Sequence, residues 1–216
     1  MLKMRSSASA TQERGRARRM ALQDAAALLL DDPGTDIDTL VLADVCAAAG
    51  IPKSSGYHFY RDIHALYADL ATRLEFDLSE ALRVPDDIAG SWRMRLARYI
   101  DTATIFFEKR PHAQKLMIGP KTPPDIKRAG RAADKGHGLQ LEAWLEGSIA
   151  PTPARGWPVP IYFFAIEIID LMFGLSLLEE GRLSAVMVNQ AIQTVSAYLA
   201  PYLDGSSQKP GKSTRA

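Results

Sequence analysis

Residues 41–66 constrain the fold more than any other stretch, because they combine a short helical pattern with a tight turn. Leu42, Val45 and Cys46 recur at the i, i+3, i+4 spacing of an amphipathic helix. Gly50 follows three alanines, and glycine most easily takes the positive φ that ends a helix. The stretch therefore predicts a short helix that ends in a sharp turn.

A second short helix is predicted directly after this turn. Pro52 can begin it, because the first turn of a helix does not use the missing N–H. Side chains that donate hydrogen bonds occupy most of its positions: Lys53, Ser54, Ser55, Tyr57 and His58. Two helices around a glycine turn, the second rich in donors, indicate a helix-turn-helix whose second helix enters the major groove of DNA.

The segment from Asp44 to Tyr60, Asp-Val-Cys-Ala-Ala-Ala-Gly-Ile-Pro-Lys-Ser-Ser-Gly-Tyr-His-Phe-Tyr, resembles the DNA-binding signature of the tetracycline-repressor (TetR) family of bacterial regulators. The resemblance covers roughly residues 14–75. Lys53, Ser54 and Ser55 would lie in the first turn of the recognition helix, near base edges. The resemblance implies that Tyr57 and His58 reach backbone phosphates, which position the protein without specifying the sequence.

Four residues depart from this pattern, at the cap, the turn, the helix interior and the phosphate contact: Val41, Pro52, Gly56 and Ile63. Val41 stands where the family has a Ser or Thr cap, so we expect Asp38 or Thr39 to cap an earlier-starting helix. Gly56 replaces a larger residue and loosens the recognition helix by roughly 1 kcal/mol relative to alanine. Ile63 replaces a lysine that grips phosphate in the family.

The overall charge requires that any nucleic-acid surface be local. The formal net charge is only +1, and 47% hydrophobic with 24% charged residues is typical of a soluble globular chain. Residues 1–20 nevertheless hold one acid, Glu13, against six basic side chains: Lys3, Arg5, Arg14, Arg16, Arg18 and Arg19. A helix over 13–30 would carry Arg18, for which phosphate contact and a merely solvated face are equally plausible.

The only cysteine, Cys46, excludes an intrachain disulfide and is expected to be a small buried apolar side chain rather than a thiol sensor. The first residues lack the apolar core of a signal peptide, which predicts a cytoplasmic protein.

Helical periodicity continues through the chain without a convincing period-2 segment, so the fold class is predicted to be all-α with about nine helices. Later helices are expected over 62–83, 91–109, 125–147, 161–178 and 184–203, with a proline-rich loop over 151–160. We predict a flexible arm (1–12), a helix-turn-helix domain (13–62), a helical regulatory and dimerisation domain (63–204) and a disordered tail (205–216).

The stretch 161–178 is apolar over most of its circumference, interrupted by Glu167, Asp170, Gly174 and Ser176. Two acids in mid-span would each cost about 3 kcal/mol in a membrane, so a buried helix is predicted. Two uses of Glu167 and Asp170 remain open: contact with a cationic or donor-rich ligand, or hydrogen bonds across a helical bundle.

A dimer interface is predicted from the last two helices. The final helix has an apolar seam at 4-3-4-3 spacing, which suits packing against another helix. A twofold partner would complete a four-helix bundle. The residues assigned to this interface are Ile168, Met172, Val188, Ile192, Val195 and Leu199.

The resemblance implies a small-molecule effector that enters between helices of the larger domain and changes the spacing of the DNA-binding helices. Five aromatic or small residues and one acid, on helices expected to face one another, form the predicted pocket, although an ordinary core explains each one at least as well. They are Tyr99, Ala103, Phe107, Trp144, Phe163 and Glu167.

No catalytic motif, cofactor loop or metal-ligand spacing stands out, so we expect no enzyme activity, no catalytic residues, no cofactor and no metal site. The favoured function is a dimeric regulator, a repressor released from a pseudopalindromic DNA operator by its effector. The alternatives are an all-α enzyme or ligand carrier with an incidental helix-turn-helix, and a protein-interaction adaptor.

Overall fold

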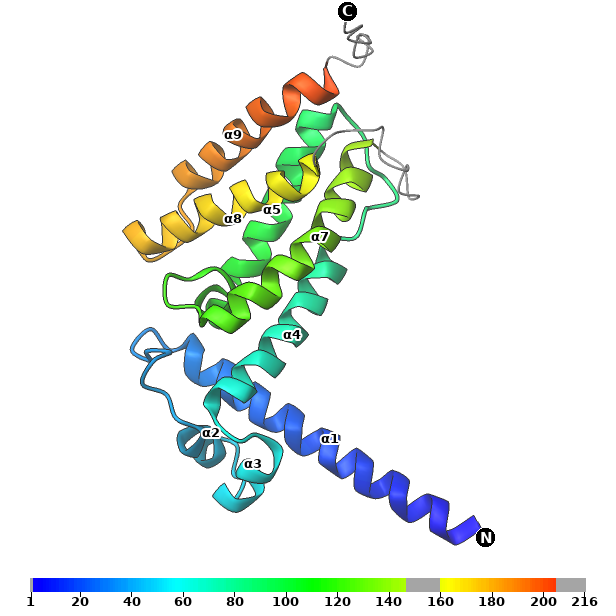
Figure 1. Ribbon diagram of the computed structural model, residues 1–216, viewed down its shortest axis with the longest axis vertical. Helices are drawn as coiled ribbons and strands as arrows, with labels where there is room; N and C mark the ends of the chain where they lie inside the picture. The colour runs from blue at the N-terminus through cyan, green and yellow to red at the C-terminus, as the bar shows by residue number, and fades with distance from the viewer. Residues whose placement is uncertain (1, 147–159, 205–216) are drawn as a thin grey trace, which may run out of the picture. The chain divides into compact units, whose positions relative to one another are not determined.

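A computed structural model describes the backbone of residues 2–146 and 160–204, and the side chains of the first helix from Gln12 onward. This part of the chain contains nine α-helices, one short π-helical stretch and no strand, as predicted (Figure 1). The elements are α1 (Leu2–Asp31), α2 (Leu42–Ala48), α3 (Lys53–Phe59), α4 (Ile63–Ala81), α5 (Trp92–Glu108), α6 (Pro111–Ala113), η1 (Gln114–Ile118), α7 (Pro124–Glu146), α8 (Ile161–Glu180) and α9 (Ala185–Leu203).

The first helix is longer than predicted. It begins at Leu2 rather than at Glu13, so the stretch expected to be a flexible arm has a helical backbone. Residues 2–12 contain neither glycine nor proline, and nothing in them interrupts a helix. The predicted tail at 205–216 and nearly all of the predicted loop at 151–160 lie outside the described residues.

The start of α2 corrects the predicted cap. Val41, with φ −114° and ψ 155°, immediately precedes the helix, and its N–H donates to Asp44 Oδ2 at 3.4 Å. A cap at Asp38 or Thr39 is therefore wrong. Those two residues lie in a separate turn, in which the Thr39 N–H donates to the carbonyl of Asp36 at 3.1 Å. Because that turn holds their backbone, the helix cannot begin there.

The chain packs into two compact units. Unit 1 comprises 1–78 and 106–130, and unit 2 comprises 79–105 and 131–216. Helices α4, α5 and α7 contribute residues to both units. The division after residue 62, which follows from the DNA-binding pattern, stays a prediction.

Unit 1 is built around α1, α2 and α4, whose apolar faces meet in a common core. Four leucines recur at four-residue steps along α4, and all are buried: Leu66, Leu70, Leu74 and Leu78. Four further side chains are fully buried and come from α1 and α2: Leu22, Leu30, Val45 and Cys46. The burial of Cys46 agrees with its predicted role as a small apolar side chain.

Unit 2 contains α8 and α9, which pack along each other. Gly181, with φ +69°, ends α8 in the left-handed region. Ser184 caps α9, as its Oγ accepts from the Met187 N–H at 3.3 Å. The last two helices, predicted over 161–178 and 184–203, are therefore confirmed in number and order.

By length and composition α8 could cross a membrane, and it is the only helix of the described residues that passes that test. About 44% of its apolar window is buried inside the protein. The buried core helix of a globular protein passes the same test.

Helix α7 continues without a break through Gly136 and Gly138, although glycine is a poor helix former. An added Cβ at Gly138 would lie 3.0 Å from the backbone nitrogen of Phe163. Gly138 therefore permits a close approach of α7 and α8 within unit 2.

Candidate nucleic-acid interface

The turn between α2 and α3 has the geometry that its sequence predicts. Gly50 has φ +63°, and its N–H donates to the carbonyl of Ala47 at 3.1 Å. The next N–H, of Ile51, donates to the Cys46 carbonyl at 2.9 Å. These two bonds occupy the carbonyls left over at the end of α2, so the chain reverses sharply into α3.

Gly56 brings α3 into direct contact with α2. The residue is buried, and a Cβ added to it would lie only 2.1 Å from Cys46 Sγ. No side chain fits in that space without displacing the sulfur. The sequence-based interpretation of Gly56 as a weak point of the helix thus missed its packing role, which no local pattern reveals.

Five of the six predicted DNA-contacting side chains are exposed. Lys53 and Ser54 lie in the first turn of α3, and Tyr57 and His58 lie one turn further on, with Tyr57 52% exposed. Arg18 on α1 is also exposed, whereas Ser55 is half-buried. The exposed side of α3 therefore offers an ammonium, two hydroxyls and an imidazole to solvent.

A buried polar network holds the end of α3. The Tyr60 hydroxyl donates to Asp69 Oδ2 at 2.6 Å, and Gln23 Nε2 donates to the same oxygen at 2.9 Å. Arg19 lies 3.8 Å from that carboxylate and over the Tyr60 ring. Burial, reinforced by the Asp69 hydrogen bond, raises the pKa of Tyr60 well above its usual value, so the phenol stays protonated and keeps donating.

This network connects α1, α3 and α4, and sequence reasoning missed it. Tyr60 itself is buried, with 4% of its surface exposed. The missed signal was Gln23, a polar side chain within the apolar face of α1.

The corner between α3 and α4 carries an additional cation. Asp62 Oδ1 accepts from the Ala65 N–H at 2.8 Å and caps α4, and this bond lowers the pKa of the Asp62 carboxyl. Arg61 Nε lies 3.1 Å from Asp62 Oδ2, with its side chain 85% exposed. Arg61 thus places a positive charge two positions before Ile63. Position 63 is the one at which the resemblance implies a lysine.

The loop between α1 and α2 is anchored by residues from the middle of the chain. Lys115 Nζ donates to the carbonyls of Asp32 and Thr35 at 2.9 and 2.8 Å. Lys121 pairs with Asp36, and that hydrogen bond lowers the pKa of the Asp36 carboxyl. The entry into α2 is therefore set by contacts that are distant in sequence but lie within unit 1.

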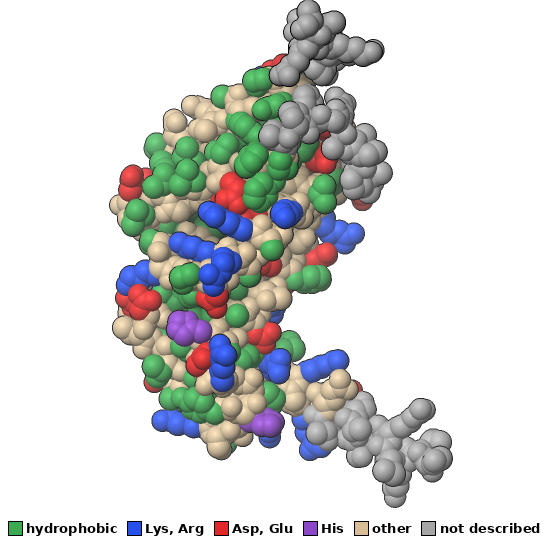
Figure 2. Space-filling view, in the orientation of Figure 1, with side chains coloured by type: hydrophobic (Ala, Val, Ile, Leu, Met, Phe, Trp, Pro, Cys, Tyr) green, Lys and Arg blue, Asp and Glu red, His purple; other side chains and the backbone are tan. Residues whose placement is uncertain are grey.

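Exposed basic groups gather on unit 1 around these helices. Figure 2 shows blue and purple side chains at the lower end of the view, where Figure 1 places α2 and α3. Besides Lys53 and Arg61, the exposed cations on this unit include Arg16 and Arg18 of α1. With a net charge of only +1, any surface for nucleic acid must be local. These exposed cations on α1, α3 and the α3–α4 corner form such a local basic patch.

The predicted effector residues lie in different surroundings. Tyr99 and Trp144 are 2% exposed and pack edge to face with ring centres 5.7 Å apart. The Tyr99 hydroxyl donates to the His137 carbonyl at 3.4 Å, and Trp144 Nε1 donates to the Leu82 carbonyl at 2.7 Å. These two rings therefore form part of the core of unit 2.

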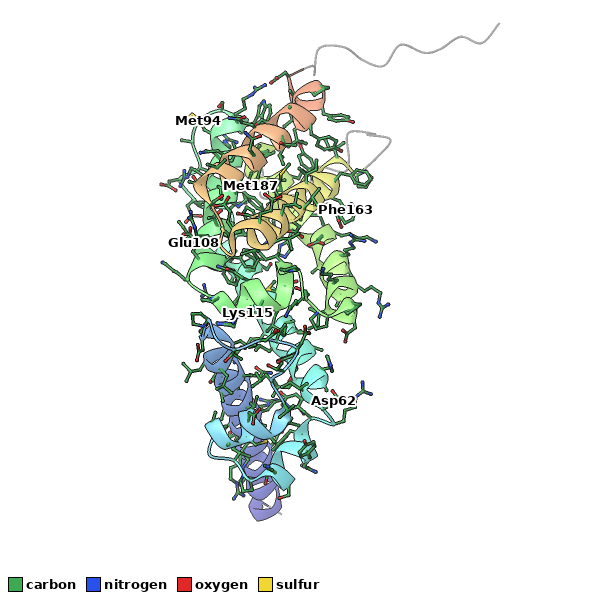
Figure 3. All side chains as sticks on the ribbon, turned by 90° about the vertical axis from the view of Figure 1, so that its left-hand side faces the viewer. Asp62, Met94, Glu108, Lys115, Phe163 and Met187 are labelled. Carbon is green, nitrogen blue, oxygen red and sulfur yellow. The ribbon has the colours of Figure 1, made fainter. Side chains whose placement is uncertain are left out.

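The remaining predicted effector residues are less uniform. Ala103 is buried on α5, and Phe107 belongs to unit 1. Phe163 lies on α8 (Figure 3) and is half-buried. Glu167 Oε2 lies 3.5 Å from Arg131 Nε, while its Oε1 is buried without a hydrogen-bond partner. The six residues differ in burial and surroundings, and the effector pocket stays a prediction.

The predicted dimer residues divide by burial. Val188, Val195 and Leu199 are at most 9% exposed within one chain. Ile168, Met172 and Ile192 are half-buried. Three apolar side chains on α8, spaced seven residues apart, are more exposed: Phe164 (41%), Leu171 (58%) and Leu178 (62%).

Within the described residues, no group of three or more His, Cys, Asp or Glu side chains could hold a metal ion.

Comparison with known proteins identifies the fold. No family model and no curated protein matches the sequence. A crystal structure of a TetR-family transcriptional regulator from Streptomyces coelicolor is similar, with a TM-score of 0.65. The match covers 86% of this chain and 99% of that one, at 22% sequence identity. The chain therefore has a TetR-like fold, which confirms the resemblance noted in its helix-turn-helix.

Proposed function

We propose that this TetR-like chain is a DNA-binding transcriptional regulator that acts as a homodimer. The observation that carries the proposal is the exposed, donor-rich face of α3, on a helix whose other side is packed against α2 at Gly56. A rigid helix with free donors can enter the major groove and hydrogen-bond base edges.

The contacts follow from the exposed groups. Lys53 and Ser54 lie in the first turn of α3, which places them where recognition helices contact bases, with Ser55 partly covered behind them. Tyr57 and His58 are suited to backbone phosphates. Arg18 on α1 and Arg61 at the α3–α4 corner add phosphate contacts, so Arg61 takes the role of the missing lysine.

A homodimer would present two such helices. Self-association is supported by the exposed row of Phe164, Leu171 and Leu178 on α8, which leaves apolar surface in contact with water. The apolar surface also includes three half-buried side chains: Ile168, Met172 and Ile192. The other three predicted interface residues are buried within one chain: Val188, Val195 and Leu199. With two recognition helices about 34–36 Å apart, the dimer would bind a pseudopalindromic operator.

Regulation by a small effector completes the proposal, with the protein acting as a repressor. Glu167 supports it, because a carboxylate oxygen buried without a partner is costly unless something satisfies it. A donor-rich ligand between α5, α7 and α8, near Tyr99 and Phe163, would supply that hydrogen bond.

Selection of bound fragments from genomic DNA, followed by fluorescence anisotropy, tests the proposal. Lys53→Ala with Tyr57→Phe should weaken specific binding by about 10-fold or more, since loss of a base contact costs about 1–3 kcal/mol. Arg83→Ala, an exposed change in unit 2, is the matched control and should bind normally. Affinity should fall steeply as salt rises. Absence of salt-dependent DNA binding would favour an all-α ligand carrier or enzyme.

A further inference from the structure

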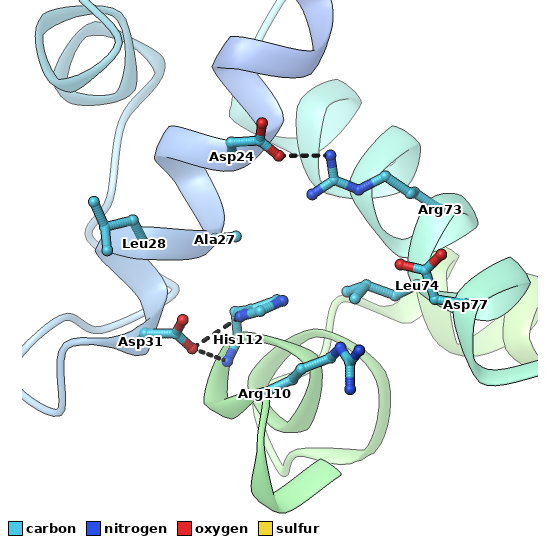
Figure 4. A pocket seen from close by; sticks show the side chains of 9 residues that line it. All are labelled: Asp24, Ala27, Leu28, Asp31, Arg73, Leu74, Asp77, Arg110 and His112. Atoms are coloured by element: carbon cyan, nitrogen blue, oxygen red, sulfur yellow. Dashed lines mark hydrogen bonds and ion pairs between the residues drawn. The ribbon is translucent and has the colours of Figure 1, made fainter. Parts of the chain in front are cut away.

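An open cleft of about 530 Å³ lies entirely within unit 1, between α1, α4 and the segment that enters α6 (Figure 4). It contains none of the residues assigned to DNA contact or to the predicted effector pocket. Its polar lining consists of three acids, two arginines and a histidine: Asp24, Asp31, Asp77, Arg73, Arg110 and His112. Such a mixed lining offers both signs of charge to one small ligand.

Four of these charged or polar groups are already paired within the wall of the cleft. Arg73 Nη1 lies 2.8 Å from Asp24 Oδ1. His112 Nδ1 and the His112 backbone nitrogen each lie 2.8 Å from Asp31 Oδ1. Figure 4 shows Asp24 and Asp31 on α1, with dashed lines to Arg73 of α4 and His112 of α6. These pairs tie α1 to α4 and α6 and leave little capacity for a ligand.

The other two charges have no ion-pair partner among the described residues. Arg110 stacks over the Phe106 ring at 4.3 Å and donates from Nη1 to the Phe106 carbonyl at 3.3 Å. These contacts orient the guanidinium but do not neutralise it. Asp77, on α4, is half-buried and lines the same cleft. The cleft therefore holds one uncompensated cation and one uncompensated anion.

An apolar surface lies beside these charges. Leu28 is 72% exposed, and Ala27 and Leu74 are the other apolar residues that line the cleft. An exposed leucine at a concave charged site gives an aliphatic group a place to bury surface, at about 25 cal/mol per Å² removed from water.

We propose that this cleft binds a small zwitterion with an aliphatic side chain, of the free amino-acid type. The ligand carboxylate pairs with Arg110, its ammonium pairs with Asp77, and its side chain covers Leu28. Arginine can hold a carboxylate through two parallel N–H donors. A bound zwitterion would bridge α4 and the start of α6, and would thereby stabilise unit 1 independently of any effector in unit 2.

The test uses the full chain, without DNA, and three matched probes: L-leucine, L-leucinamide, which lacks the carboxylate, and 4-methylpentanoate, which lacks the ammonium. Binding is measured by calorimetry and by NMR shifts of the His112 imidazole, which lies in the cleft. Leucine should bind about fivefold more tightly than either analogue, since an exposed charge pair contributes up to about 1 kcal/mol. The His112 signal should move with leucine.

Two variants locate each charge. Asp77→Asn should remove the preference for leucine over 4-methylpentanoate, and Arg110→Gln should remove the preference for leucine over leucinamide. Arg110→Lys keeps the positive charge and should retain most of that second preference. Arg83→Gln is the control outside the cleft. Equal binding of all three probes, no leucine binding, or preferences unchanged in both variants would overturn the proposal. Because DNA is absent, failure here leaves the proposed regulator role untouched.

Discussion

The contact between Gly56 and Cys46 makes a quantitative prediction about the helix-turn-helix. A Cβ at position 56 would lie 2.1 Å from Cys46 Sγ, whereas carbon contacts are optimal at about 3.5–4.0 Å. Cys46 is completely buried, so its sulfur has no solvent to move into. Gly56→Ala should therefore force α2 and α3 apart.

Two effects of opposite sign set the magnitude. Alanine is better than glycine in a helix by about 1 kcal/mol. Overpacking a buried contact costs about 1–3 kcal/mol, and an overlap this deep belongs at the upper end. The net result is a loss of about 2 kcal/mol of local stability for Gly56→Ala.

The effect of Gly56→Ala on local stability should change sign when Cys46 is also replaced by alanine. In a Cys46→Ala background the sulfur is gone, and the nearest remaining atom, the Cβ of residue 46, lies 3.8 Å away in ordinary contact. Gly56→Ala should then stabilise the helix by up to about 1 kcal/mol. The coupling free energy between the two positions should be about 3 kcal/mol, near the top of the range for residues in direct contact.

Amide hydrogen exchange over residues 42–59 measures the local stability directly. Gly136→Ala, in a helix position with open space around it, is the control and should stabilise α7 in either background. If Gly56→Ala changes protection equally with and without the Cys46 sulfur, the contact does not exist as described and the reasoning is refuted.

Three further predictions follow from the same unit and from α8. Tyr60→Phe should destabilise unit 1 by about 1–3 kcal/mol in urea, because the buried Gln23 amide and the half-buried Asp69 carboxylate each lose a bond; no change would show that the network is solvated. The pKa of Asp62 is lowered by capping α4, so its contribution is present above the ordinary carboxyl pKa and is lost as acid protonates the group. Asp62→Asn should therefore flatten the acid side of the stability profile, measured by circular dichroism. Leu171→Glu should yield folded monomers by light scattering, whereas Val195→Glu should unfold the chain; a dimeric Leu171→Glu variant would move the proposed interface away from α8.

Periodic features were predictable from the sequence alone. The leucine row of α4, the turn at Gly50, the cap at Ser184 and the all-α class each depend on local spacing or on one residue's conformational preference. The helix-turn-helix pattern likewise identified the fold, because its order and spacing lie within one short stretch of sequence. These features need no knowledge of distant partners.

Features that join distant residues were decided only by the tertiary structure. Gly56 reads as a weak point until Cys46 is placed against it, and Gln23 reads as a stray polar residue until Tyr60 and Asp69 are brought to it. The start of α2 at Leu42 also depends on a neighbouring turn that holds Thr39. Helix periodicity shows which face is apolar but not which atoms it meets, because the packing of one helix on another depends on residues far apart in the chain. For that reason the sequence by itself determined the helices and their order, and only tertiary packing decided why Gly56 must be glycine.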